Sequence, residues 1–189
     1  MSSFGAVLDT CVLIQAGIRD TLLRAAGAGL YCVHWSEDIL RELESNLPDV
    51  ARITPAQVQK LTNQIDQFFP EAKARAYQPL IPSMPVNPED RHVVAAAVAT
   101  GSPVTVTTNL RHFPNDVLAP YGIEAQHPDD FLTDLCDLSP DIMVQILFQQ
   151  AASLRNPPKN FDWLMDHLEK TTPRFCAAIR ERLTVPPSQ

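Results

Sequence analysis

Four oxygen-bearing side chains stand at points of this chain where a fold could bring them together. Asp9 closes the apolar run FGAVLD, Glu42 lies within SEDILRELE, Asp90 opens DRHVVAAAVATG, and Asn109 follows PVTVTT. In an α/β sheet, side chains at the carboxyl ends of strands or in the first turn of a helix face the crevice where ligands bind. Divalent cations such as Mg²⁺ and Mn²⁺ prefer oxygen ligands. The pattern therefore predicts a metal-dependent hydrolytic site and favours a nuclease.

The segments that must position these residues alternate between strand and helix patterns. Short apolar or β-branched runs at 6–8, 30–34, 104–108 and 122–125 predict strands. Helical spacing or capping signals predict helices that end near Gly27 or Gly29, begin at Ser36, Thr54-Pro55 and Pro114, and run from Glu89 to Gly101. We expect an α/β fold of three layers, with a mainly parallel sheet flanked by helices.

Prolines set two further expectations for the first 135 residues. Pro48 is expected to end the helix that Ser36 begins. Residues 78–88 hold four prolines, which predicts an extended connection without regular structure.

The chain changes character after Phe131. Helical spacing begins again at Pro140, Phe161 and Phe175, and residues 136–189 contain no strand signal. We therefore predict two domains, an α/β domain at 1–135 and an α-helical C-terminal appendage at 136–189.

Composition limits the functional classes. No apolar stretch approaches the roughly 20 residues that a membrane-spanning helix needs, and no secretory pattern opens the chain. The four cysteines (Cys11, Cys32, Cys136, Cys176) form no CxxC pair, which predicts buried, reduced thiols in a cytoplasmic protein. The net charge of −7, without a Lys/Arg run, disfavours broad electrostatic capture of nucleic acid and favours recognition at a structured site.

Four segments together carry a family resemblance. In this order, LDTCVL, SEDILRELESNL, NPEDRHVVAAAVATG and VTTNLRHFP resemble the PIN-domain nucleases, particularly the VapC-like toxins of bacterial toxin–antitoxin systems, over about residues 4–132. The resemblance implies a PIN-like fold and cleavage of single-stranded RNA, with Asp9, Glu42 and Asp90 as catalytic ligands of Mg²⁺ or Mn²⁺. It also implies a homodimer and an antitoxin that occupies the active-site groove. The C-terminal helices resemble an extension found in some VapC-like proteins, without an implied role.

This chain departs from the family at one position of the site. Many PIN domains have an aspartate where Asn109 stands; an amide oxygen binds a metal or its water but adds no charge, so a second ion should bind more weakly. Asp116 either supplies the missing carboxylate, as a further metal ligand, or is a solvated charge in the first turn of a helix. Glu89, adjacent to Asp90, is expected to point away from the site.

Few cations are available to contact RNA. Arg111 and His112 follow Asn109, and Arg91 and His92 follow Asp90, so we expect these side chains at the mouth of the site. Arg111 could pair with a phosphate oxygen, and the alternative is an ordinary surface cation.

Two functions stay open from the sequence. The first is a metal-dependent endoribonuclease, the toxin of a toxin–antitoxin pair. The second is a catalytically weakened PIN-like domain that binds RNA or protein, which Asn109 and the acidic charge favour. A haloacid-dehalogenase-like phosphatase is excluded, because it needs a second aspartate two residues after the first, where this chain has Cys11.

Overall fold

The computed structural model describes residues 4–155 and 157–184, and contacts within it divide the chain into two compact units. The first unit comprises Met1–Gln15 and Tyr31–Gln126, and the second comprises Ala16–Leu30 and His127–Gln189. This grouping differs from the predicted division at residue 135, because residues 16–30 and 127–135 join the C-terminal helices. The division into domains 1–135 and 136–189 stays a prediction, and its end segments 1–3 and 185–189 lie outside the described residues.

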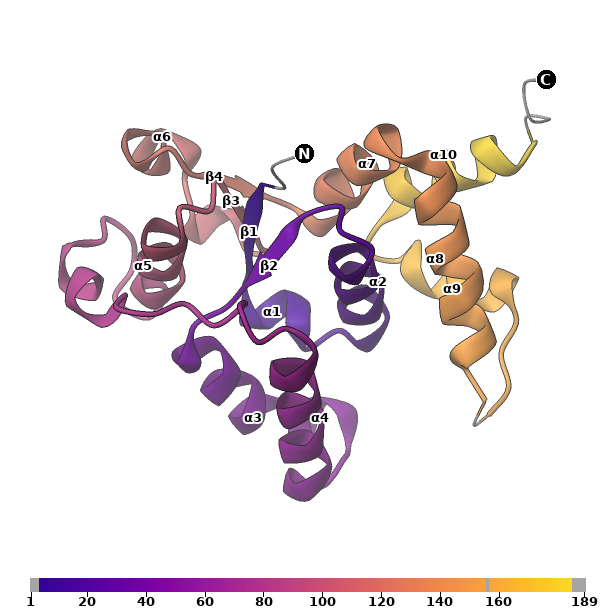
Figure 1. Ribbon diagram of the computed structural model, residues 1–189, viewed down its shortest axis with the longest axis horizontal. Helices are drawn as coiled ribbons and strands as arrows, with labels where there is room; N and C mark the ends of the chain where they lie inside the picture. The colour runs from indigo at the N-terminus through magenta and orange to yellow at the C-terminus, as the bar shows by residue number, and fades with distance from the viewer. Residues whose placement is uncertain (1–3, 156, 185–189) are drawn as a thin grey trace. The chain divides into compact units, whose positions relative to one another are not determined.

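The first unit is built on a parallel sheet of four short strands (Figure 1). These are β1 (Gly5–Leu8), β2 (Cys32–His34), β3 (Val104–Val106) and β4 (Glu124–Gln126), in the spatial order β2-β1-β3-β4. Every pairing is parallel, with Ala6 opposite Val33 on one side and Val104 on the other. The predicted α/β fold with a parallel sheet flanked by helices is confirmed. Because β1 lies beside both β2 and β3, the chain reverses its direction of strand addition at β1, which is where α/β sheets open a ligand crevice.

The helices of this unit pack on the sheet and against one another. They are α1 (Thr10–Leu13), α3 (Glu37–Ala51), α4 (Pro55–Phe68), α5 (Arg91–Thr100) and α6 (Asn115–Leu118), with 3₁₀ turns η1 (Gln78–Ser83), η2 (Leu110–His112) and η3 (Ala119–Tyr121). The helix α5 packs on β1, β2 and β3 through a fully apolar run that includes the buried Val93, Val94 and Ala97. It stops at Gly101, whose φ of 63° needs no Cβ, as the sequence predicts.

Two expectations about prolines are wrong. Pro48 lies inside α3, which continues to Ala51 and closes on Arg52 in the left-handed region. Pro48 removes one backbone donor, but Leu47 is buried and α3 packs along α4, so tertiary packing keeps the helix intact. In the proline-rich connection, Gln78–Ser83 forms a 3₁₀ helix with a proline in its first turn, where the missing N–H costs nothing.

The expectation of four buried thiols is only partly right. All four cysteines are free, and Cys136 and Cys176 are buried, whereas Cys32 is exposed and Cys11 is half-buried.

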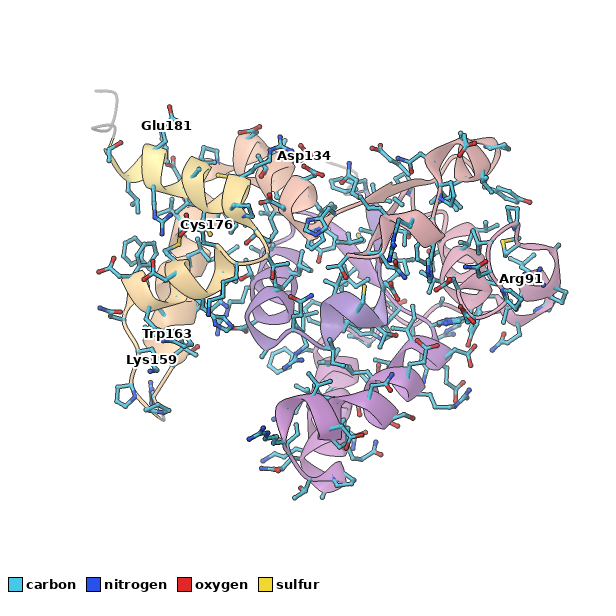
Figure 2. The ribbon with its side chains drawn as sticks, turned by 180° about the vertical axis from the view of Figure 1, so that it is seen from behind. Arg91, Asp134, Lys159, Trp163, Cys176 and Glu181 are labelled. Atoms are coloured by element: carbon cyan, nitrogen blue, oxygen red, sulfur yellow. The ribbon has the colours of Figure 1, made fainter. Side chains whose placement is uncertain are left out.

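The second unit consists of helices. They are α2 (Ala16–Gly27), α7 (Pro128–Leu138), α8 (Pro140–Ser153), α9 (Phe161–Leu168) and α10 (Pro173–Thr184), and the predicted C-terminal helices are thus confirmed. A buried Gln150 fixes α2 to α8 by donating to Gly17 O and accepting from Thr21 Oγ1. Figure 2 shows Lys159 close to Trp163, with Nζ 4.9 Å from the ring centroid. Within the described residues, none of the helices is long and apolar enough to cross a membrane.

Candidate active site

Asp9 lies where β1 ends and the short helix α1 begins. Its Oδ2 accepts hydrogen bonds from Thr107 Oγ1 at 2.7 Å and from Cys11 Sγ at 3.0 Å. Thr107 directly follows β3, so the ends of two neighbouring strands meet at this carboxylate. Burial, reinforced by the charge of Asp9, raises the pKa of Cys11 to about 11, which keeps the thiol protonated as a donor.

The Glu42 carboxylate is bonded to Thr10, the residue after Asp9. Ser36 caps α3 by accepting from Ile39 N, and Glu42 lies on the next turns of that helix. Its Oε2 accepts from Thr10 Oγ1 at 2.7 Å, and its Oε1 lies 3.0 Å from His92 Nε2. This pair of contacts links the start of α1 to α3 and α5.

Hydrogen bonds and charge shift the protonation of this pair. Burial by itself would raise the pKa of Glu42, but hydrogen bonds from His92 and Thr10, with the charge of His92, lower it. Burial opposes the charged form of His92, yet the pKa of His92 is raised by Glu42 first and then by Asp38 and Asp9. Both shifts strengthen the pairing of an ionised Glu42 with a ring N–H of His92.

Asp90 occupies the N-cap position of α5 without capping it by a side-chain hydrogen bond. Its Oδ2 instead lies 2.9 Å from His112 Nδ1. Burial raises the pKa of Asp90, the charges of Asp9 and Glu89 add to that effect, and His112 opposes it.

Glu89 lies beside Asp90 and His112, contrary to the expectation that it points away from the site. Glu89, Asp90 and His112 each offer a ligand atom, and these atoms lie within 4.8 Å of one another. The expectation treated Glu89 as helical, but α5 begins only at Arg91, and Glu89 lies in the preceding turn. Adjacent residues in a turn are not forced onto different faces as they are on a helix.

The remaining predicted oxygen ligands occupy different surroundings. Asn109 is half-buried, and its N–H donates to Thr107 Oγ1 at 3.0 Å, the same hydroxyl that donates to Asp9. Asp116 is exposed in the first turn of α6. Across residues 4–155 and 157–184 it makes no hydrogen bond or ion pair with Asp9, Glu42 or Asp90.

The basic side chains that were expected to contact RNA differ in exposure and in their hydrogen-bond partners. Arg111 is exposed, and His112 is half-buried against Asp90. Arg91, labelled in Figure 2, donates from Nε to Val86 O at 3.1 Å and from Nη1 to Pro82 O at 3.5 Å, so it braces the proline-rich connection. His92 is 8% exposed and is engaged with Glu42 and Ser36, which contradicts the expectation that it contacts RNA.

Sequence reasoning missed two residues of the site. Thr107 and Cys11 hold Asp9, and neither belongs to a charged or metal-ligating pattern. The available signal was position, because Thr107 directly follows a strand and Cys11 comes two residues after Asp9.

The donor set fits a divalent cation. Two carboxylates and one imidazole nitrogen, from Glu89, Asp90 and His112, lie within 4.8 Å of one another. Among the described residues Asp9 and Glu42 do not belong to this group, although the charges of Asp9 and Glu89 add to the raised pKa of Asp90. Oxygen ligands with an imidazole suit Mg²⁺ or Mn²⁺, the second metal accepting nitrogen more readily.

Comparison with known proteins finds a curated relative and a matching family model. The chain is 43% identical over 109 residues to a Mycobacterium tuberculosis (strain ATCC 25618 / H37Rv) protein described as "Putative ribonuclease VapC50". The VapC-like resemblance is confirmed. The match covers 58% of this chain and 64% of the relative, so the chain spans less than two thirds of that protein. A family model described as the VapC50 C-terminal domain matches residues 128–181, and no solved structure matches significantly.

Proposed function

We propose that this protein is a metal-dependent endoribonuclease, the toxin of a toxin–antitoxin pair. One observation carries the proposal: Glu42 is bonded both to Thr10, which follows Asp9, and to His92, which lies two residues after Asp90. These two bonds hold segments next to Asp9 and next to Asp90 against the helix that carries Glu42, which supports a site shared by the three acids. Similarity to a protein described as a VapC ribonuclease supports the same chemistry.

Asp9, Glu42 and Asp90 would hold Mg²⁺ or Mn²⁺ as catalytic ligands. When bound, such an ion activates water and stabilises negative charge on the phosphoryl oxygens of RNA. Thr107 and Cys11 fix the Asp9 carboxylate through its Oδ2. Asn109, which shares the Thr107 hydroxyl, would orient the attacking water or the phosphate as the fourth catalytic residue.

Further residues extend the proposed site. Glu89 and His112 would add ligands next to Asp90. Asp116 would supply to a second ion the carboxylate that Asn109 lacks. Arg111 would bind a phosphate oxygen at the mouth of the site, with His112 beside it. Arg91 remains a weaker RNA contact, because carbonyl oxygens already engage its guanidinium.

The proposed partners are single-stranded RNA, a cognate antitoxin and a second copy of this chain. A cytoplasmic location follows from the proposal, because an RNA-cleaving toxin of this class meets both its substrate and its antitoxin there.

Cleavage of single-stranded RNA tests the proposal. The full chain should cut RNA with Mn²⁺ and lose activity in excess EDTA, while Asp9→Asn, Glu42→Gln and Asp90→Asn should each abolish cleavage without unfolding the protein. Asp49→Asn is the matched control, since it removes one charge from an exposed position of the same unit. Cleavage by Asp90→Asn at the wild-type rate would refute the assignment.

A binding module is the second candidate, and Asn109 favours it because an amide adds no charge to the site. That function predicts RNA or protein binding without cleavage, and no gain of thermal stability from Mn²⁺. Strong stabilisation by Mn²⁺ that Asp9→Asn and Asp90→Asn abolish would exclude it.

A further inference from the structure

His92 is a buried histidine whose two ring nitrogens both have partners. It lies in the first turn of α5 and is 8% exposed. Nε2 lies 3.0 Å from Glu42 Oε1, and Nδ1 lies 3.4 Å from Ser36 Oγ. Ser36 Oγ accepts from Ile39 N at 3.1 Å, and its own hydrogen can point at Nδ1. That arrangement places a ring proton on Nε2, facing Glu42.

Glu42 needs such a partner because burial does not fix it. Its side chain is 42% exposed, and immobilising a glutamate costs rotamer entropy. His92 holds Oε1 and Thr10 holds Oε2, so the two donors lie on opposite sides of the carboxylate. An ionised carboxylate offers about four lone-pair sites. Two remain for a cation after both hydrogen bonds are made.

We propose that His92 is a positioning residue that, together with Thr10, holds the Glu42 carboxylate in the orientation that binds the metal ion. The inference rests on the proposed metal-dependent function. Ser36 has two roles in this arrangement. It caps α3, and it contacts the imidazole of His92, which in turn restrains Glu42 of the same helix. Hydrogen-bond partners of metal ligands commonly contribute 10- to 100-fold to metal affinity.

Two amide substitutions test whether the hydrogen bond to Glu42, and not the space filled by the His92 side chain, supports metal binding. In His92→Gln the amide nitrogen reaches about as far as Nε2 and can donate to Glu42, whereas His92→Asn is one methylene shorter and cannot. Isothermal titration of Mn²⁺ into each full-length protein measures the dissociation constant. We expect His92→Asn to bind Mn²⁺ at least about 10-fold more weakly than wild type, and His92→Gln to recover most of that loss. Equal affinities for the two variants would overturn the proposal.

A second pair keeps the test decisive if His92→Asn does not fold. Thr10→Val should weaken Mn²⁺ binding and Thr10→Ser should restore it, because only serine keeps the donor to Oε2. Unchanged affinity in Thr10→Val would overturn the two-sided restraint. His34→Gln is the matched control, since His34 is a half-buried histidine of β2 that contacts Ala72 O.

Asp90→Asn distinguishes a failure of the positioning role of His92 from a failure of the metal centre. Loss of Mn²⁺ binding in Asp90→Asn with wild-type affinity in His92→Asn would overturn only the positioning role. Wild-type Mn²⁺ affinity in Asp90→Asn would overturn the metal centre itself and the role of His92 with it.

Discussion

Asp129 should be the most sensitive acidic residue for the stability of the helical unit. It lies in the first turn of α7, is 6% exposed, and accepts hydrogen bonds from two backbone N–H groups that begin α10. Oδ2 accepts from Arg174 N at 3.2 Å, and Oδ1 accepts from Phe175 N at 2.9 Å. A residue 45 positions earlier thus satisfies donors that a helix cannot satisfy by itself.

The structure allows the loss in Asp129→Ala to be estimated. Each hydrogen bond to a charged group contributes about 1.5–3 kcal/mol, and removal of the carboxylate leaves the buried Phe175 N–H without an acceptor. Since caps are worth about 0.5–2 kcal/mol when taken singly, we expect Asp129→Ala to lower the free energy of unfolding by about 2–4 kcal/mol. Asp129→Asn keeps an acceptor for one donor and should lose about half as much.

Asp130 supplies the matched control. It is the next residue and also acidic. Within the part of the chain that the structure describes, its side chain pairs only with that of Arg174, and the two side chains are 44% and 67% exposed. An exposed ion pair contributes about 0–1 kcal/mol, so Asp130→Ala should behave almost like wild type. Urea denaturation followed by far-ultraviolet circular dichroism would measure all three variants. Equal losses for Asp129→Ala and Asp130→Ala would show that the cap across helices does not stabilise α10.

Three further predictions concern the first unit. Burial raises the pKa of Asp90, and the charges of Asp9 and Glu89 add to that effect. The metal-free protein should therefore lose stability as pH rises from the ordinary aspartate range through the raised pKa. Asp90→Asn should reduce this loss, as measured by urea titrations in the presence of EDTA. Thr105 Oγ1 is buried without a hydrogen-bond partner among the described residues, so Thr105→Val should stabilise the protein by about 1 kcal/mol, and a shift of the urea midpoint to lower concentration would argue against this. Arg111→Gln should weaken RNA binding equally across sequences and lower the salt slope by about 1 in a fluorescence-anisotropy titration.

Local sequence signals predicted most elements of the fold because each signal acts over a few residues. Ser36 accepts from Ile39 N and Thr54 from Gln57 N, so both helix starts are settled within one turn of chain. Gly101 ends α5 for an equally local reason. Pro48 shows the limit of this reasoning, because packing of α3 on α4 outweighs the helix-breaking effect of a proline.

The sequence by itself determined which side chains are able to bind a cation and that each lies at the end of a strand or near the start of a helix. Only the tertiary structure decided which of them touch, since Asp9 meets Thr107 across 98 residues and Glu42 meets His92 across 50. Those contacts depend on β3 pairing beside β1 and on α5 packing over both strands. A hydrogen bond forms only between atoms about 3 Å apart, and spacing along a chain sets no such distance between residues this remote.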